Sequence, residues 1–174
     1  FWALITMTAA VAVHDAILET CGLQTDIKWA NDVHVNEKKL CGILAETVDI
    51  KSVVLGIGIN LSRKSVSPEL SETAASIESE TGVEPSPEDL LQSLLRHFDK
   101  VYSVLHDIEG DKKIIAEWIK RSSYAFNKRV CVKLEDESFT GTTRGLNEFG
   151  ALLVENESQI IKTVYAGELV NLRS

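Results

Sequence analysis

Hydrophobic positions follow two different periods in the two parts of the chain. Up to about residue 120, helix-length patterns alternate with apolar runs of strand length. From Arg129 onward, five short apolar runs follow one another, separated by residues that favour tight turns. The pattern predicts an α+β protein of two domains, residues 1–125 and 126–174.

The first apolar stretch predicts a helix buried in a core. Residues 1–13 carry apolar side chains almost all the way round a helix, the helix is expected over residues 3–21, and Gly22 suits the left-handed position that ends a helix. Residues 1–13 are too few for a bilayer, which needs ~20 apolar residues, and they lack the basic segment of a signal peptide. Because the chain opens inside this helix without an initiator Met, we expect a fragment.

Further patterns in the first domain predict one mixed sheet with helices packed on one side. The strand-like runs are 27–29, 33–35, 40–45 and 53–59. A polar connection over 62–87 contains a short helical candidate, 71–81, followed by Gly82. Ser86 and Pro87 then begin a long amphipathic helix that runs to residue 105, and a shorter helix covers 114–119.

The second domain is predicted to be a small barrel of five strands. Its apolar runs lie at 130–134, 138–141, 151–154, 160–165 and 169–172. Asn147, Gly150, Asn156 and Gly167 are among the turn residues between them. Short strands joined by tight turns are typical of such barrels.

Composition narrows the function classes. Hydrophobic residues make up 44% and charged residues 25%, which is typical of a folded soluble protein rather than a disordered one. The net charge of −8 disfavours nucleic acids and anionic membranes as partners. The three cysteines are odd in number and widely spaced, so we expect no disulfide framework or zinc site, and a cytoplasmic location.

Residues 28–46 hold the strongest candidate chemistry. Two strands meet at the turn Asn36-Glu-Lys38, and a simple hairpin register would place Val35 opposite Lys39, Val33 opposite Cys41, and Asp32 beside Gly42. Asn31 lies at the same end of the hairpin. A cation, an anion, an amide and a bare glycine would then converge, and the glycine would let a ligand approach the backbone.

A second glycine-containing segment, Gly56-Ile-Gly-Ile-Asn60, ends an apolar run. Paired glycines are found in dinucleotide-binding loops, but the third glycine and the following helix are missing here. The segment instead suggests close approach of a ligand to the backbone at Gly58, with Asn60 offering hydrogen-bond donors and an acceptor at the strand end.

Four motifs in order resemble the biotin protein ligase family. Lys28-Trp-Ala-Asn-Asp32 resembles its Lys-Trp-Pro-Asn-Asp signature, and Lys39-Leu-Cys-Gly-Ile-Leu-Ala-Glu46 follows at the usual distance. Gly56 to Asn60 matches its strand-end motif. Residues 141–154 and 167–170 resemble its C-terminal SH3-like domain, which follows a catalytic domain like that of class II aminoacyl-tRNA synthetases. The resemblance covers nearly the whole chain.

The resemblance implies an enzyme that activates biotin with ATP and Mg²⁺ to biotinoyl-5′-AMP, then transfers biotin to a lysine of a biotin carboxyl carrier protein. Lys39 matches the catalytic lysine that contacts the biotin carboxylate and the α-phosphate. Asp32 matches the aspartate that positions the acceptor amine. The implied binding residues are Asn31, Lys28, Gly42, Leu44, Asn60, Gly58 and Arg144; no metal ligand is implied.

The sequence departs from the family in two ways. Ala30 stands where the signature has proline, which loosens the backbone but removes no reacting group. The Gly-Arg-Gly-Arg loop and the Ser/Thr-rich biotin segment of the family precede the region that this chain matches, as does the helix-turn-helix domain of repressor-type ligases. We therefore expect weak or no catalysis from these 174 residues alone, and no DNA binding by them.

Two other functions remain open. A short homologue could bind carrier domains or adenylates without catalysis, or the protein could be a lipoate ligase, although the Lys-Trp-x-Asn-Asp spacing and the tail disfavour lipoate. The family also often forms homodimers through sheet edges.

The sequence leaves two interpretations open for some residues and favours a single one for others. Lys28 is either a ligand contact or a surface charge, and Arg144 either contacts nucleotide or only occupies a strand. Trp29 is interpreted as core, and Cys41 has no neighbouring cation except Lys39 to activate its thiol. Packing or surface roles are expected for His14, His34, His97 and His106.

Overall fold

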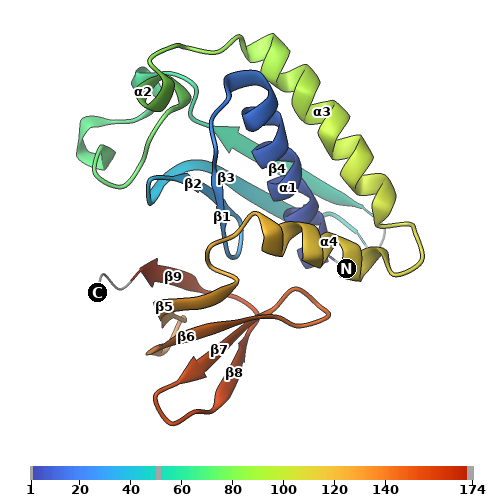
Figure 1. The fold of residues 1–174 in the computed structure, drawn as a ribbon, viewed down its shortest axis with the longest axis vertical. Coiled ribbons are helices and arrows are strands. Elements are labelled where there is room, and N and C mark those ends of the chain that lie inside the picture. The colour runs from blue at the N-terminus through green and yellow to red at the C-terminus, as the bar shows by residue number, and fades with distance from the viewer. Residues whose placement is uncertain (1, 50–51, 172–174) are drawn as a thin grey trace.

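The first helix, α1 (Trp2–Cys21), lies at the centre of the N-terminal part of the fold (Figure 1). The computed structural model describes residues 2–49 and 52–171, so Phe1 and Leu172, the outer ends of two expected segments, lie outside the described residues. Within α1, the side chains of Ala9, Val13 and Ile17 are fully buried. The segment Ala3–Cys21 is long and apolar enough to cross a bilayer, but 67% of its most apolar window is buried in the fold, as in a core helix.

Four strands form the sheet that α1 covers. They are β1 (Asp26–Lys28), β2 (Asp32–Val35), β3 (Lys38–Thr47) and β4 (Val53–Ile59), in that spatial order. All described ladders between them are antiparallel, so the prediction of a mixed sheet is wrong for this part of the chain. The connections are too short for parallel neighbours, which need a crossover of about a dozen residues or more.

Two further helices, α3 (Pro87–Val104) and α4 (Gly110–Lys120), pack on α1 (Figure 1). Ser86 caps α3 by accepting a hydrogen bond from the Asp89 amide, as its sequence predicts. An ion pair of 2.7 Å between Arg121 and Asp15 ties the end of α4 to α1. The helix expected at 71–81 is shorter, α2 (Ile77–Thr81), because residues before Ser76 form turns and two 3₁₀ segments, Arg63–Ser65 and Pro68–Leu70.

The C-terminal strands form a second antiparallel sheet. They are β5 (Phe126–Lys133), β6 (Ser138–Leu146), β7 (Leu152–Asn156), β8 (Ile161–Val164) and β9 (Glu168–Asn171). Their order is β8-β7-β6-β5-β9, and the described pairings leave β8 and β9 as separate edges, so the described strands form no closed barrel and the predicted small barrel is not confirmed. Hydrophobic alternation predicts strands but does not determine whether edge strands pair.

The two sheets meet where the β1–β2 connection touches the C-terminal sheet. Trp29, 5% exposed, donates a hydrogen bond of 3.1 Å from Nε1 to the carbonyl of Gly150. The start of β9 lies near the β2–β3 hairpin, because Glu168 of β9 and Lys39 of β3 line one cavity. The C-terminal sheet therefore supports one end of the hairpin that holds the motif residues.

Candidate functional site

A β-bulge sets the positions of the motif residues. Val33 pairs with Cys41 and Asp32 with Gly42, as expected, but Val35 pairs with Lys38 and His34 with Lys39. The predicted Val35–Lys39 pair is therefore wrong. The turn consists of Asn36 and Glu37, both with positive φ, and the register shifts after it because Leu40 is an extra residue in β3.

The bulge brings Lys39 onto the face of the sheet that carries Asp32 and Gly42. In a regular strand, residues 39 and 42 would point to opposite faces, because side chains alternate. One extra residue between them removes that difference. The buried neighbours Leu40 and Cys41 are the sequence signal of this bulge, since both turn inward toward the core.

Lys39 and Asp32 form the ion pair at the centre of this face. Lys39 Nζ lies 2.6 Å from Asp32 Oδ1, and the Lys39 side chain is 48% exposed. A Cβ placed on Gly42 would lie 3.1 Å from Lys39 Cε, so the glycine leaves the space in which the lysine lies. A half-exposed ammonium and a less exposed carboxylate thus stand over a bare strand backbone.

The surrounding face of β3 and β4 is open and lacks side-chain cover. Gly42 pairs with Gly58 and Leu44 with Gly56 across the two strands. A Cβ on Gly56 or Gly58 would meet only ordinary contacts, so protein packing does not require these glycines. Together with Asn31 and Lys39, they line a shallow groove of about 480 Å³. Bare backbone in such a groove allows a flat ligand to lie directly on the strands.

Two asparagines fix the ends of the groove. The side chain of Asn31 donates from Nδ2 to the Ile43 carbonyl at 2.7 Å, and the main-chain carbonyl of Asn31 accepts from the Ile43 amide. Asn60 donates from Nδ2 to Ala75 and lies in a second hollow with Lys39 and Gly58. Both amides therefore have structural bonds as well as a place at the groove.

Lys28 lies on the other side of Asp32, in a cavity of about 470 Å³ that also borders Lys39, Tyr124 and Glu168. Its Nζ is 6.0 Å from the centre of the Tyr124 ring. Burial lowers the pKa of Lys28, although Asp32 and Glu168 oppose this effect. The structure therefore places Lys28 against the site rather than on an open surface.

Neighbouring groups keep the carboxyl group of Asp32 ionised. Burial alone would raise its pKa, but His34 and Lys39 outweigh burial and keep the pKa below its ordinary value. Asp32 is therefore a carboxylate at neutral pH. Cys41, beside it, is buried, and burial raises the pKa of its thiol to about 12. Cys41 is a core residue and not an activated nucleophile.

Arg144 does not join this cluster. Its Nε lies 2.6 Å from Glu155 Oε2, and Nη1 donates to Asn127 Oδ1, both within the C-terminal sheet. The structure thus gives it a partner inside its own sheet, and a contact with nucleotide stays a prediction. Of the motif residues, Leu44 lies exposed on the groove face, as the strand alternation requires.

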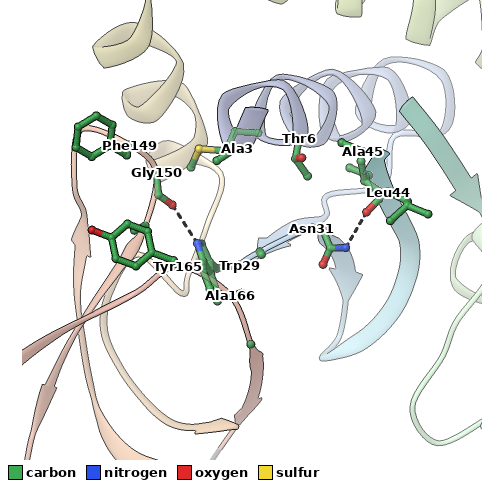
Figure 2. Close-up of a pocket in the computed structure, with 15 residues that line it drawn as sticks. Ala3, Thr6, Trp29, Asn31, Leu44, Ala45, Phe149, Gly150, Tyr165 and Ala166 are labelled. Atoms are coloured by element: carbon green, nitrogen blue, oxygen red, sulfur yellow. Dashed lines mark hydrogen bonds between the residues drawn. The ribbon is translucent and has the colours of Figure 1, made fainter. Parts of the chain in front are cut away.

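A cavity between the two sheets was not predicted from the sequence. It measures about 390 Å³, and Figure 2 shows Thr6 and Asn31 on one side and the aromatic rings of Phe149 and Tyr165 on the other. The hydrogen bond between Trp29 and Gly150 joins two residues that line this cavity. The cavity depends on how two distant segments pack, and no local pattern carries that information.

His34 is the side chain that sequence reasoning set aside and the structure brings to the site. Its Nε2 lies 3.8 Å from Asp32 Oδ2, and its side chain is 8% exposed. Strand alternation, which places residues 32 and 34 on one face, is the signal that could have found it. Within residues 2–49 and 52–171, no group of three or more His, Cys, Asp or Glu side chains is arranged to hold a metal ion.

Comparison with known sequences agrees with the motifs at both ends of the chain. Residues 2–62 match the Biotin/lipoate A/B protein ligase family, and residues 125–170 match the Biotin protein ligase C terminal domain. The Bifunctional ligase/repressor BirA of Bacillus subtilis is 34% identical over 173 residues. The chain belongs to the biotin protein ligase family. The resemblance found in the motifs is confirmed.

The relatives are longer than the region that this chain matches. The match to BirA covers 95% of the chain but 52% of BirA, so the chain spans about half the length of that relative. The Biotin--[acetyl-CoA-carboxylase] ligase of Mycobacterium tuberculosis is 28% identical, with 99% of the chain and 64% of the relative covered.

Solved structures show the same arrangement of elements. The biotin protein ligase of Aquifex aeolicus superposes with a TM-score of 0.86 at 25% identity, over 99% of this chain and 76% of that one. Its complex with biotin and ATP gives a TM-score of 0.85, with 72% of that chain covered. The ligase chain described here therefore has a biotin ligase-like fold of helices and sheets.

Proposed function

We propose that this chain supplies the ion-paired half of a biotin protein ligase site. In the proposed reaction, the biotin carboxylate attacks the α-phosphorus of ATP, pyrophosphate leaves, and biotinoyl-5′-AMP forms. A lysine amine of a biotin carboxyl carrier protein then attacks the acyl carbon, and AMP leaves. Mg²⁺ enters with ATP as part of the substrate.

The Lys39–Asp32 pair over bare glycines is the observation that carries this proposal. Adenylation brings a carboxylate and a triphosphate together, so negative charge must be offset where they meet. Lys39 is half exposed and can turn from Asp32 toward such a ligand. Gly42, Gly58 and Leu44 form the surface on which biotin would lie.

The remaining residues have proposed roles around that centre. Asp32 stays ionised and can hold the incoming acceptor ammonium after Lys39 turns away. Asn31 lines the groove, Asn60 borders the hollow on the nucleotide side, and Lys28 adds a second cation behind Asp32. For Arg144 to reach nucleotide, it would have to leave Glu155.

The domain assignment belongs to the same proposal. Residues 126–174 would form the SH3-like domain, because β5 begins the second sheet at Phe126 and the C-terminal family match covers this region. Residues 1–125 would belong to the catalytic domain, related to class II aminoacyl-tRNA synthetases. Three free cysteines favour a reducing cytoplasm, and the edge strand β4 offers a surface for a homodimer.

A lipoate ligase is the closest alternative, because one matching family includes both activities. The C-terminal match is specific to biotin protein ligases, which favours biotin. We expect the full-length protein to attach biotin to an apo carrier domain when biotin and lipoate compete at equal concentration, as followed by intact-mass spectrometry. Exclusive attachment of lipoate would overturn the proposal.

A further inference from the structure

A buried imidazole nitrogen faces a carboxylate oxygen behind the ion pair. His34 Nδ1 is 3.3 Å from the carbonyl oxygen of Glu37, and a carbonyl can only accept. Nδ1 must therefore carry the proton in the neutral ring, which leaves a lone pair on Nε2. That lone pair faces Asp32 Oδ2 at 3.8 Å, and among the described residues Nε2 has no hydrogen-bond partner.

Two acceptors facing each other in a buried place are unfavourable unless a proton joins them. Asp32 does not supply one, because the Lys39 ammonium beside it favours the ionised carboxylate. Lys39 uses the other oxygen, Oδ1, at 2.6 Å. The carboxylate thus has one oxygen toward the lysine and the groove and the other toward an imidazole ready to accept a proton.

From this geometry we propose that His34 accepts, by way of Asp32, the proton that the acceptor amine releases during biotin transfer. The proposal rests on the proposed function. The acceptor lysine arrives as an ammonium and pairs with Asp32. Before attack, one N–H bond breaks and that proton passes through Asp32 Oδ2 to His34 Nε2, which frees the lone pair of the nitrogen. The C–N bond then forms, the acyl–O bond to AMP breaks, and the nitrogen releases its second surplus proton to water.

The product of this step is a favourable ion pair. A protonated His34 donates to an ionised Asp32, and the 3.8 Å separation needs to shorten by only roughly 0.6 to 1.1 Å to reach ordinary hydrogen-bond length. His34 is 8% exposed, so water competes weakly for that proton. A carboxylate with a low pKa is a poor final acceptor by itself, and the imidazole behind it removes this limit.

The charges around His34 come from every element near it. On the sheet, Asp26 of β1 and Lys39 of β3 pair with His34, and Asp32 lies two residues before it on β2. Across the cavity stand Lys28, Glu37, Glu72, Tyr124 and Glu168. These neighbours thus include several acidic groups as well as two lysines.

The test is His34→Gln in the full-length protein, followed through single-turnover transfer of preformed biotinoyl-5′-AMP to an apo carrier domain. Glutamine can still donate to the Glu37 carbonyl but accepts no proton. We expect transfer to slow by about 10²-fold at pH 8 while adenylation is unchanged. A proton acceptor works only in its unprotonated form, so the ratio of native to variant rate should rise with pH.

Controls separate the possible failures. His106→Gln, at an exposed position after α3, should leave transfer and its pH dependence as in the native protein. Retained adenylation shows that His34→Gln folds; if it does not, His34→Asn is measured in its place. Equal transfer rates and a flat rate ratio would overturn the role of His34. A native protein that transfers no biotin would instead overturn the proposed function.

Discussion

Replacing Lys39 with alanine is expected to reduce formation of biotinoyl-5′-AMP by about 10² to 10³-fold. The ammonium of Lys39 stands at the open groove, beside bare backbone at Gly42, where a carboxylate and an α-phosphate would meet. Loss of a positive group aimed at developing charge removes stabilisation specific to the transition state. Biotin-dependent exchange of labelled pyrophosphate into ATP by the full-length protein measures this step.

Lys38→Ala is the matched control for that variant. Lys38 is the adjacent lysine of β3, but its Nζ donates to the Ser71 carbonyl, away from the groove. The variant should keep exchange activity within a few-fold of native. Lys39 would lose its assigned role if both alanine variants had the same exchange rate.

Replacing Asp32 with asparagine is expected to affect the second half-reaction. Transfer of biotin from preformed adenylate to the carrier lysine should fall by about 10²-fold or more, because asparagine cannot hold an ammonium or pass on its proton. Adenylation should change by less than tenfold, since Lys39 keeps its place in the groove. Neighbouring positive groups lower the pKa of Asp32, so the defect should persist at mildly acidic pH.

Glu46→Gln provides the matched control for Asp32→Asn. Glu46 is an exposed carboxylate of β3. It lies on the same face of the sheet as Gly42, four residues further along the strand. Its replacement should alter neither half-reaction. If Asp32→Asn slowed both half-reactions equally, the separation of roles between Lys39 and Asp32 would be wrong.

Much of the local structure could be predicted because it depends on local signals. Apolar periodicity predicted α1 and the long helix α3, and the Ser86 cap lies where the sequence placed it. The pairings of Asp32 with Gly42 and of Val33 with Cys41 followed from the turn between β2 and β3. A short turn limits which residues can face each other, so it was enough to place Asp32 beside the bare glycine, whereas Lys39 reaches that face only through the bulge.

The remaining features depend on contacts that no short pattern encodes. A simple turn gave the wrong partner for Val35, because the bulge at Leu40 shifts the register by one residue. His34 gains its place only when its strand packs beside Asp32 and the Glu37 carbonyl. The cavity between the sheets requires Phe149 and Tyr165 to approach α1 from over a hundred residues away.

Arg144 illustrates the same limit from the other direction. A contact with nucleotide was one of its two interpretations and stays a prediction, while pairing of β6 with β7 gives it Glu155 as an ion-pair partner. The closed barrel was a similar extrapolation from strand number, whereas the described ladders form an open sheet. Strand count and spacing indicate a class of domain, while edge pairing is decided by packing.

The central claim is that biotin and ATP meet on the open face of β3 and β4. A crystal structure of the full-length protein with biotinoyl-5′-AMP tests it most directly. We expect the adenylate over Gly42 and Gly58, with Lys39 Nζ turned from Asp32 to the acyl-phosphate junction. An adenylate bound instead in the cavity between the sheets, with the Lys39–Asp32 pair intact at 2.6 Å, would contradict the claim.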